Sequence, residues 1–298
     1  MFSIVIPVYN GEQTIKSALS SVENQTAKEL VEEILVIDDG STDATAACVK
    51  RQASESPIPI RLLRQKRKGP SAARNAGMRQ ARADYIAFLD ADDEWELDKL
   101  ARQAAVLREN PRIDLLCGGT TDAPLQIFLR TRKGLSHTTL REYCIKSFIL
   151  TSTVVIRKAR QQEVGYFNAR MHHSEDMNFY QKFYRWNEVY FLQGKCMRYD
   201  PVGKHAQAPG LSDDLRKMHL GRRYNYYELF RDGMISRSFF MCMIVFGEMK
   251  YVRRRLIRRW MACGRSCVYP VKNDHDTKKY LMFDRVDLNT RERKKDEI

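Results

Sequence analysis

The sequence predicts an α/β fold with a mostly parallel central sheet, on the basis of two observations. Strand-like and helical runs alternate through about the first 118 residues, which is typical of βαβ units with helices on both faces of a sheet. The strand-like runs are also nearly continuously apolar, as expected of strands buried on both faces. We expect strands at Phe2–Val8, Glu33–Asp39, Ile60–Arg64, Tyr85–Asp90 and Asp114–Gly118, and helices at Glu12–Asn24, Asp43–Ser54, Ser71–Arg82 and Trp95–Asn110.

Capping residues mark the starts of two of these helices. Ser41, Thr42 and Asp43 supply side-chain oxygens of the kind that satisfy free amides at a helix N-terminus. Pro70-Ser71 opens the next helix in a similar way. Neither Gly-x-Gly-x-x-Gly nor a Walker A lysine loop occurs in this region, which argues against a dinucleotide-binding fold and a P-loop NTPase.

The second half of the chain shows weaker periodicity, beginning with a connecting region from Thr120 to about Leu150. It contains no internal repeat. We expect helices at Thr139–Phe148 and Ser174–Trp186, strands at Ser152–Arg157, Val189–Leu192 and Cys196–Tyr199, and a helical region from Ser212 to about Trp260 before a polar tail.

The net charge restricts the classes of partner. The 298 residues carry a formal charge of +14, which favours nucleic acid, an anionic membrane or a phosphorylated substrate as partner. Part of this charge is local, because the segment from Arg237 to Lys272 holds nine basic residues and one acid, Glu248.

Targeting and cysteine patterns indicate a cytoplasmic protein. Met1-Phe2-Ser3 leads directly into a strand, without the basic segment of a signal peptide. The longest strongly apolar stretch, Phe239–Phe246, is far shorter than the roughly 20 residues that span a bilayer. Of the seven cysteines, Cys263 and Cys267 come closest to a pair, but one Cys-x3-Cys is a poor zinc signal. Free cytosolic thiols are the better interpretation.

The most informative segment is Tyr85–Asp93, in which a buried strand ends in three carboxylates. Ligands of open α/β sheets bind just outside the carboxyl ends of the strands. Asp90-Ala-Asp92 at this edge is therefore placed to hold a hard divalent cation, and through it a phosphorylated ligand. The alternative is an acidic helix cap, since Asp93 and Glu94 precede a helical stretch and helix N-termini favour acids.

Five motifs follow one another at specific spacings, although each is modest alone. They are Ser3-Ile-Val-Ile-Pro7-Val-Tyr9-Asn10, Ile37-Asp38-Asp39-Gly40-Ser41-Thr42-Asp43, Gly69-Pro-Ser-Ala-Ala-Arg74-Asn75-Ala-Gly77, Phe88-Leu-Asp90-Ala-Asp92-Asp93 and Ser174-Glu175-Asp176. On these motifs the chain closely resembles the family 2 inverting glycosyltransferases, which have the GT-A fold. The resemblance runs from about Ser3 to Gly194, roughly two-thirds of the chain.

The resemblance implies a nucleotide pocket at the ends of the first two strands. In the family, the first strand and its following turn line this pocket, which here means Pro7, Val8 and Tyr9. An aspartate at the edge of the second strand accepts from the base, and this position corresponds to Asp39, with Asp38 adjacent. Without the other motifs, these aspartates indicate a polar βα turn with an Asx cap.

The resemblance also implies metal-assisted departure of a diphosphate. Asp90 and Asp92 match the family's Asp-x-Asp, with Asp92 expected on the metal and Asp90 on the metal or on sugar and ribose hydroxyls. Carboxylates with few other protein ligands suit Mg²⁺ or Mn²⁺, which act as Lewis acids on the leaving group. Arg74 is expected to assist the diphosphate, or else to lie on a solvated helix face. His205 is expected to be a third metal ligand or a diphosphate contact, or else a structural histidine.

Asp176 matches the position of the family's general base, which takes the proton from the attacking hydroxyl. At the start of an expected helix, its carboxylate would be fixed in direction by that element. Glu175 is the fallback base. The alternative is a helix N-terminus with acids in its first turn.

The carboxyl-terminal helical region is amphipathic. Met249, Val252, Leu256 and Trp260 form one helical stripe, and arginines occupy much of the remaining circumference. This pattern fits a helix lying on an anionic membrane surface, or one that packs its stripe on the catalytic domain. The segment lacks regularly spaced stacking aromatics, so no nucleic-acid partner is expected. The arginines are Arg253, Arg254, Arg255, Arg258 and Arg259.

These inferences predict a cytoplasmic enzyme, peripheral at the inner face of the cell membrane, that transfers a sugar with inversion. Residues 1–210 are expected to form the GT-A catalytic domain, divided into a nucleotide-sugar-binding half at 1–119 and an acceptor half at 120–210. Residues 211–298 are expected to form a helical, basic, membrane-contacting region.

The expected reaction moves a sugar from a nucleotide-sugar donor to a hydroxyl of a glycan or lipid-linked acceptor, in bacterial surface polysaccharide or lipopolysaccharide synthesis. UDP-sugars are the expected donors, with dTDP- and GDP-sugars as alternatives. The alternative function is a non-catalytic nucleotide-sugar-binding protein anchored to a membrane by its basic carboxyl-terminal region.

Overall fold

The computed structural model describes residues 1–186, 188–198 and 214–264. The chain divides into two compact units, Met1–Tyr251 and Val252–Ile298. Of the second unit, only the end of one long helix falls within the described residues. The site considered below lies wholly in the first unit.

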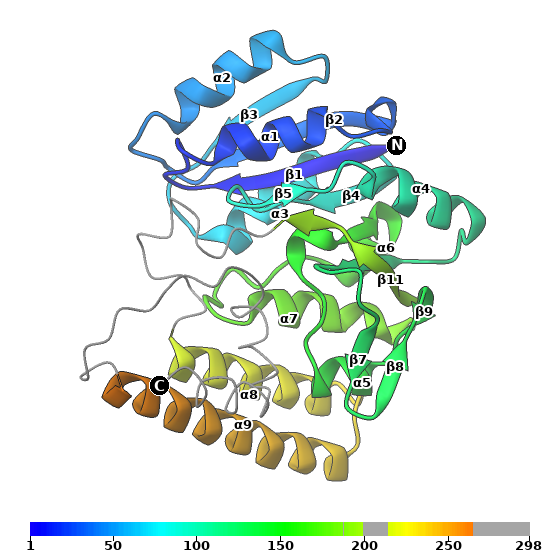
Figure 1. Ribbon diagram of the computed structural model, residues 1–298, viewed down its shortest axis with the longest axis vertical. Helices are drawn as coiled ribbons and strands as arrows, with labels where there is room; N and C mark the ends of the chain where they lie inside the picture. Colours follow the sequence, from blue (N-terminus) through cyan, green and yellow to red (C-terminus); the bar gives the residue numbers. More distant parts are fainter. Residues whose placement is uncertain (187, 199–213, 265–298) are drawn as a thin grey trace. The chain divides into compact units, whose positions relative to one another are not determined.

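An eight-stranded, mostly parallel sheet forms the centre of the first unit, and the predicted α/β fold class is confirmed (Figure 1). The first strand pairs in parallel with the second and fourth, so the alternating half of the sequence builds one side of the sheet. One short strand near the middle runs antiparallel to both neighbours. In spatial order the strands are β3 (Ile60–Arg64), β2 (Val31–Asp38), β1 (Phe2–Val8), β4 (Tyr85–Phe88), β10 (Val155–Arg157), β6 (Leu115–Gly119), β11 (Val189–Lys195) and β9 (Leu135–His137).

Helices cover both faces of this sheet. Alternate residues of the central strands point to opposite sides, so each face of the sheet has its own apolar cluster. Ile4 and Ile6 of β1 belong to one apolar cluster, whereas Val5 belongs to the other. On the first face lie α1 (Ile15–Glu23), α2 (Thr45–Glu55) and α4 (Lys99–Glu109). On the second face lie α3 (Pro70–Gln80), α5 (Leu140–Ile145), α6 (Lys158–Val164) and α7 (Glu175–Gln181).

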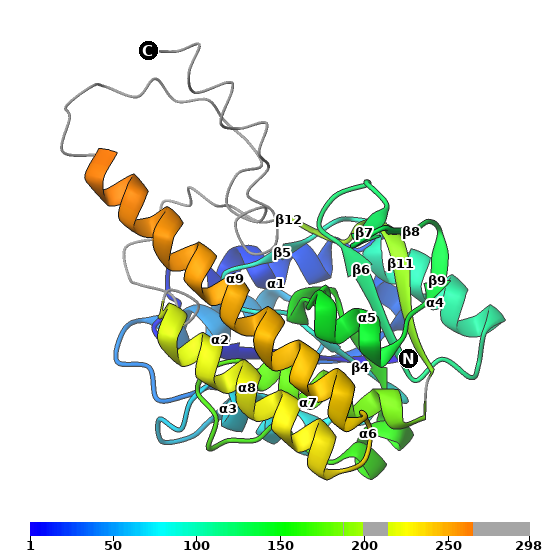
Figure 2. The ribbon, with the colours of Figure 1, turned by 90° about the horizontal axis from the view of Figure 1, so that it is seen from below.

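Two further helices, α8 (Leu215–Arg231) and α9 (Arg237–Gly264), run antiparallel, with α8 beside the first half of α9 (Figure 2). This pair buries three side chains in the apolar cluster on the second face of the sheet: Tyr226, Leu229 and Met243. The compact unit therefore continues past residue 210, where the sequence suggested a boundary. The two helices are separated at Gly233, whose φ of 70° ends α8.

Several expected boundaries are wrong around the acidic segment. β4 ends at Phe88, so Asp90 lies in the following turn. Glu94–Trp95 forms strand β5, which pairs with β12 (Met197–Arg198), and the next helix begins only at Lys99. Asp93 is therefore not a helix cap. Smaller elements are the hairpin of β7 (Leu125–Ile127) and β8 (Arg130–Arg132), and the 3-10 turns Lys28–Leu30, Thr151–Thr153 and Lys182–Arg185.

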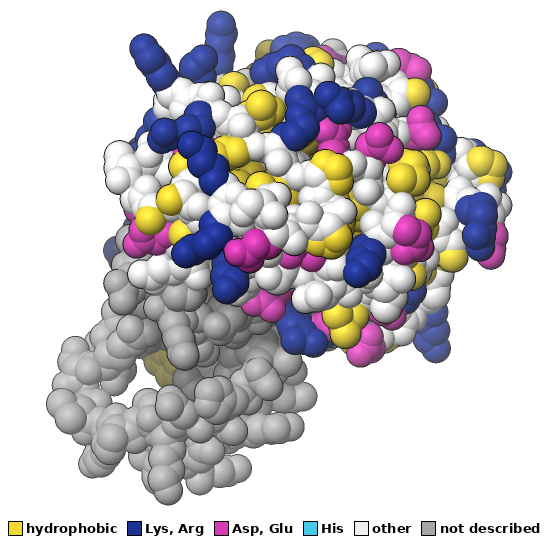
Figure 3. Space-filling view, turned by 90° about the horizontal axis from the view of Figure 1, so that it is seen from above, with side chains coloured by type: hydrophobic (Ala, Val, Ile, Leu, Met, Phe, Trp, Pro, Cys, Tyr) yellow, Lys and Arg dark blue, Asp and Glu magenta, His cyan; other side chains and the backbone are white. Residues whose placement is uncertain are grey.

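Basic side chains are widely spread over the surface. In Figure 3, Lys and Arg side chains are scattered across the face seen from above, with acidic ones between them. No helix within the described ranges is both long and apolar enough to cross a bilayer.

Candidate functional site

The carboxyl ends of β1, β2 and β4 bring most of the expected site residues to one edge of the sheet. Val8 pairs with Asp38 across β1 and β2, and Val5 pairs with Phe88 across β1 and β4. Pro7 lies inside β1, and Tyr9 follows it with 37% of its surface exposed. The guanidinium of Arg67 stacks 3.8 Å from the centroid of the Tyr9 ring.

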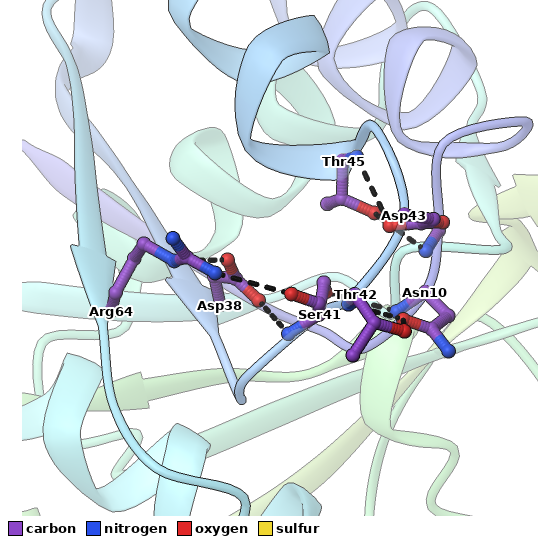
Figure 4. A network of polar contacts seen from close by, with 8 residues as sticks. Asn10, Asp38, Ser41, Thr42, Asp43, Thr45 and Arg64 are labelled. Carbon is purple, nitrogen blue, oxygen red and sulfur yellow. Dashed lines mark hydrogen bonds and ion pairs between the residues drawn. The ribbon is translucent and has the colours of Figure 1, made fainter.

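Asp38 holds the turn after β2 in place. It is fully buried, with one carboxylate oxygen 2.7 Å from the Ser41 amide and the other 2.8 Å from Arg64 Nε (Figure 4). The same network joins the turn to the β1 end, where Asn10 Oδ1 accepts from the Thr42 amide at 2.9 Å. Both oxygens of Asp38 are thus engaged within the fold, as the polar-turn alternative predicts.

Asp39 anchors the loop that leads into α3. Its Oδ1 accepts from the Lys68 amide at 2.8 Å and from Gln65 Nε2 at 2.7 Å, and its Oδ2 accepts from the Gly69 amide at 2.7 Å. Gly69 has a φ of 90°, a conformation that glycine adopts without strain. Each carboxylate oxygen accepts about two hydrogen bonds, so Oδ2 keeps one acceptor position for a ligand.

Arg74 of α3 reaches the acidic turn that follows β4, Asp90–Asp93. Its side chain is 7% exposed, which rules out a solvated helix face. One terminal nitrogen donates to Asp90 Oδ1 at 2.6 Å, and the other lies 3.9 Å from Glu175 Oε1. These carboxylates raise the pKa of Arg74 although its burial acts in the opposite direction. Nε and Nη1 have no hydrogen-bond partner among the described residues, so this cation has donors left for a ligand.

The turn after β4 concentrates negative charge. Burial and the nearby Asp90 carboxylate raise the pKa of Asp93 to about 8. Ser152 fastens the turn, because its Oγ accepts from the Asp90 amide at 3.0 Å and donates to Asp93 Oδ2 at 2.5 Å. Asp92 is left exposed.

This charge distribution fits a divalent cation shared with a ligand. After burial, the Asp90 carboxylate is the next cause of the raised pKa of Asp93, and a bound cation would relieve that repulsion. Within the described ranges, no three His, Cys, Asp or Glu side chains gather as a metal-binding group. Mg²⁺ and Mn²⁺ can bind through one or two protein carboxylates and complete their shell with phosphate and water. His205, the expected third ligand, lies outside the described residues.

Asp176 lies in the first turn of α7 and faces the same cluster. Its Oδ1 accepts from the Met177 amide at 2.7 Å, and burial raises its pKa, with Arg74, Asp90 and Arg222 among the charges that act on it. The adjacent Glu175 has its pKa raised to about 7 by burial and by Asp176. Glu175 thus lies beside Arg74, and the charges of Arg74 and Asp90 act on both candidate bases.

Helix α8 supports the turn before Asp176, a contact that the sequence did not suggest. Ser174 has a φ of 57°, its carbonyl accepts from Asn225 Nδ2 at 2.9 Å, and its hydroxyl donates to the Met218 carbonyl at 3.2 Å. A Cβ on Gly221 would lie 2.4 Å from the His173 carbonyl oxygen. A glycine inside a helix was the one available signal, and it marks this close approach.

Comparison with known proteins places the chain in a family. The model of the family described as "Glycosyl transferase family 2" matches residues 3–230. The chain belongs to this family. Its resemblance to the family 2 glycosyltransferases, first seen in five short motifs, is therefore confirmed.

Individual relatives match shorter parts. The chain is 40% identical over 37% of its length to the Escherichia coli UDP-Glc:alpha-D-GlcNAc-diphosphoundecaprenol beta-1,3-glucosyltransferase WfgD, covering 42% of that protein. It is 29% identical over 58% of its length to the amylovoran biosynthesis glycosyltransferase AmsB of Erwinia amylovora, covering 61% of that protein. The chain spans only part of the length of the curated relatives that it matches, and as little as 17% of one of them.

A solved structure shares the fold of this glycosyltransferase family 2 chain. It is Staphylococcus aureus TarS 1-349 in complex with UDP-GlcNAc, with a TM-score of 0.62 and 24% identity. The alignment covers 82% of the present chain and 70% of that structure.

Proposed function

We propose that this family 2 protein is an inverting glycosyltransferase that moves a sugar from a nucleotide-sugar to an acceptor hydroxyl. The observation that carries the proposal is the ion pair of Arg74 with Asp90 at the edge of β1, β2 and β4, with Asp92 exposed in the same turn and Asp176 near enough for both charges to act on it. Such an edge offers a donor site on one side and a proton acceptor on the other.

Asp176 is the proposed general base. As the acceptor oxygen attacks the anomeric carbon, its proton passes to the Asp176 carboxylate, the new C–O bond forms, and the bond to the diphosphate breaks on the opposite face. The raised pKa of Asp176 makes it a stronger base than a solvated aspartate. The amide of Met177 fixes the orientation of the carboxylate.

The acidic turn and Arg74 are proposed to stabilise the leaving diphosphate. Asp92 and Asp90 are the proposed ligands of Mg²⁺ or Mn²⁺, which supplies Lewis-acid stabilisation of the departing diphosphate when bound. Arg74 orients Asp90 through the 2.6 Å bond and keeps free donors for phosphate oxygens. Pro7, Val8, Tyr9 and the open acceptor position of Asp39 are the proposed nucleotide contacts, and Asp38 shapes the turn beside them.

A UDP-sugar is the proposed donor, and the hydroxyl of a glycan or lipid-linked sugar is the proposed acceptor. The names of WfgD and AmsB, a UDP-glucose-dependent enzyme and an enzyme of amylovoran biosynthesis, support a role in bacterial surface polysaccharide synthesis. The UDP-GlcNAc bound to TarS is consistent with a UDP-sugar donor.

The test is thermal stabilisation by nucleotide-sugars in the presence of Mn²⁺. A bound donor raises stability by about 2.7 kcal/mol at 100 times its Kd. We expect a UDP-sugar to raise the Tm of the wild type and of Asp84→Asn, and EDTA or Asp92→Asn to remove most of the rise. Asp84 is a matched control because it is an exposed aspartate at the other end of β4.

Two outcomes would count against the proposal. If no nucleotide-sugar raises the Tm, the nucleotide-sugar site is wrong. If a UDP-sugar binds but UDP is never released with any glycan or lipid-linked acceptor, the chain is the non-catalytic binding protein instead.

A further inference from the structure

The α8–α9 pair is apolar on two sides, and only one of them faces the core. Six large apolar side chains point away from the core and are 42–65% exposed. In Figure 2, α8 and the first half of α9 lie in front of the other helices of the first unit. We call these six residues the outer face: Leu220, Tyr224, Tyr227, Met241, Val245 and Met249.

The outer face follows the helical repeat and is not a chance exposure. Met241, Val245 and Met249 occur at i, i+4 and i+8 on α9, while Met243 between them is buried in the core. Met249, the first residue of the stripe noted in the sequence, is 65% exposed.

Positive charge accompanies the outer face. Arg216 on α8 and Arg237 at the start of α9 are exposed. Glu248, the sole acid of α9, is already engaged by Arg223 at 2.9 Å and His219 at 3.0 Å.

We propose that the outer face docks the chain on an anionic lipid bilayer, with the helices lying in the interface. Apolar side chains would enter the headgroup and acyl boundary while the arginines contact lipid phosphates. Tyrosine, which occurs twice in the outer face, favours this depth because its ring is amphipathic. A second copy of the chain fits less well, because a two-fold contact through the same face would bring the basic residues together.

The docking surface goes beyond the proposed transfer reaction and can be tested without a donor. Full-length protein is mixed with vesicles of phosphatidylcholine alone or with added phosphatidylglycerol, and the bound fraction is measured by sedimentation. We expect binding to the anionic vesicles only. Val245→Glu should weaken this binding about tenfold or more, because it places a charge where an apolar side chain would otherwise enter the bilayer.

Leu97→Glu is the matched control. Leu97 is 53% exposed and Val245 is 57% exposed, so both variants place one carboxylate at an exposed apolar position. Leu97 lies between β5 and α4, outside the outer face, and its variant should bind like the wild type. The proposal is overturned if the wild type stays in solution with anionic vesicles, or if Val245→Glu binds them as well as Leu97→Glu does. A wild-type dimer that Val245→Glu converts to monomers, without vesicle binding, would assign the surface to a second copy.

Discussion

Lys99 is a fully buried lysine outside the candidate site. Its Nζ donates to Gln103 Oε1 at 2.8 Å and lies 3.8 Å from the centroid of the Trp95 ring. Burial lowers its pKa to about 7 from an ordinary value of 10.5. Between these values the folded chain holds a neutral amine while the unfolded chain binds a proton.

Lys99 therefore makes stability depend on pH. Because the unfolded state binds more protons, this residue makes the free energy of unfolding rise with pH, by up to about 1.4 kcal/mol per unit. The contribution is present above pH 10.5 and is lost as the pH falls through about 7. We expect the Tm of the wild type, relative to that of Lys99→Met, to increase between pH 7 and pH 10. A constant difference over that range would contradict a buried neutral lysine.

At the residue scale, the sequence motifs identified Arg74, Asp90 and Asp176 because chemistry restricts which residue types can serve there. They did not identify Ser152, which fastens the acidic turn from 59 residues away in the chain. A serine in a strand-like run has no local pattern that distinguishes it. Asp38 was grouped with the ligand-binding residues, whereas both of its oxygens serve the turn after β2.

At the element scale, the contact of α8 with the turn before α7 gives the next prediction. Gly221→Ala adds a Cβ that would lie 2.4 Å from the His173 carbonyl oxygen, so the turn that carries Asp176 must move. We expect kcat to fall at least about tenfold, since a 1 Å misplacement can cost about a hundredfold. The affinity for the donor, measured by titration with the UDP-sugar, should stay within about twofold of the wild-type value, because α3 and β4 are not displaced.

Gly247→Ala is the control for this variant. Its added Cβ would meet only Tyr226, at 4.0 Å, which is an ordinary contact. Removing a helical glycine should then stabilise α9 by about 0.5–1 kcal/mol with kcat unchanged. Equal behaviour of the two alanine variants would show that α8 does not position the turn.

The expected elements were accurate where periodicity is local and failed where pairing is distant. β1, β3 and the start of α3 agree with the apolar runs and with Pro70 at the first turn. Trp95 was expected to begin a helix, with Glu94 just before it, because the residues that follow have helical spacing. Glu94–Trp95 forms a strand because Met197–Arg198, about a hundred residues later, provides the hydrogen-bonding partner.

At the scale of the whole molecule, α8 and the first half of α9 are part of the core of the first unit. Tyr226 is 2% exposed, and its hydroxyl donates to the Cys144 carbonyl at 2.9 Å. Tyr226→Ala should lower the free energy of unfolding by about 3–5 kcal/mol, and Tyr226→Phe by about 1 kcal/mol. Urea unfolding followed by circular dichroism and by fluorescence should give coincident, shifted transitions.

Separate transitions would contradict this integration. If Tyr226→Ala unfolded α8 and α9 alone and left the midpoint of the sheet unchanged, residues 1–210 would be an independent domain after all. The sequence suggested that boundary because the motifs end before it and the composition becomes basic. Burial of Tyr226 and Leu229 against the sheet domain is a tertiary property that composition does not record.

The most direct test of the proposed function is the rate of transfer by Asp176→Asn at saturating donor and Mn²⁺. Asparagine keeps the shape of the side chain and can still accept from the Met177 amide, but it cannot take a proton. We predict a loss of about 10²–10⁴ in kcat, with thermal stabilisation by the donor unchanged. A variant that keeps the full rate of transfer would contradict the assignment of Asp176 as the general base.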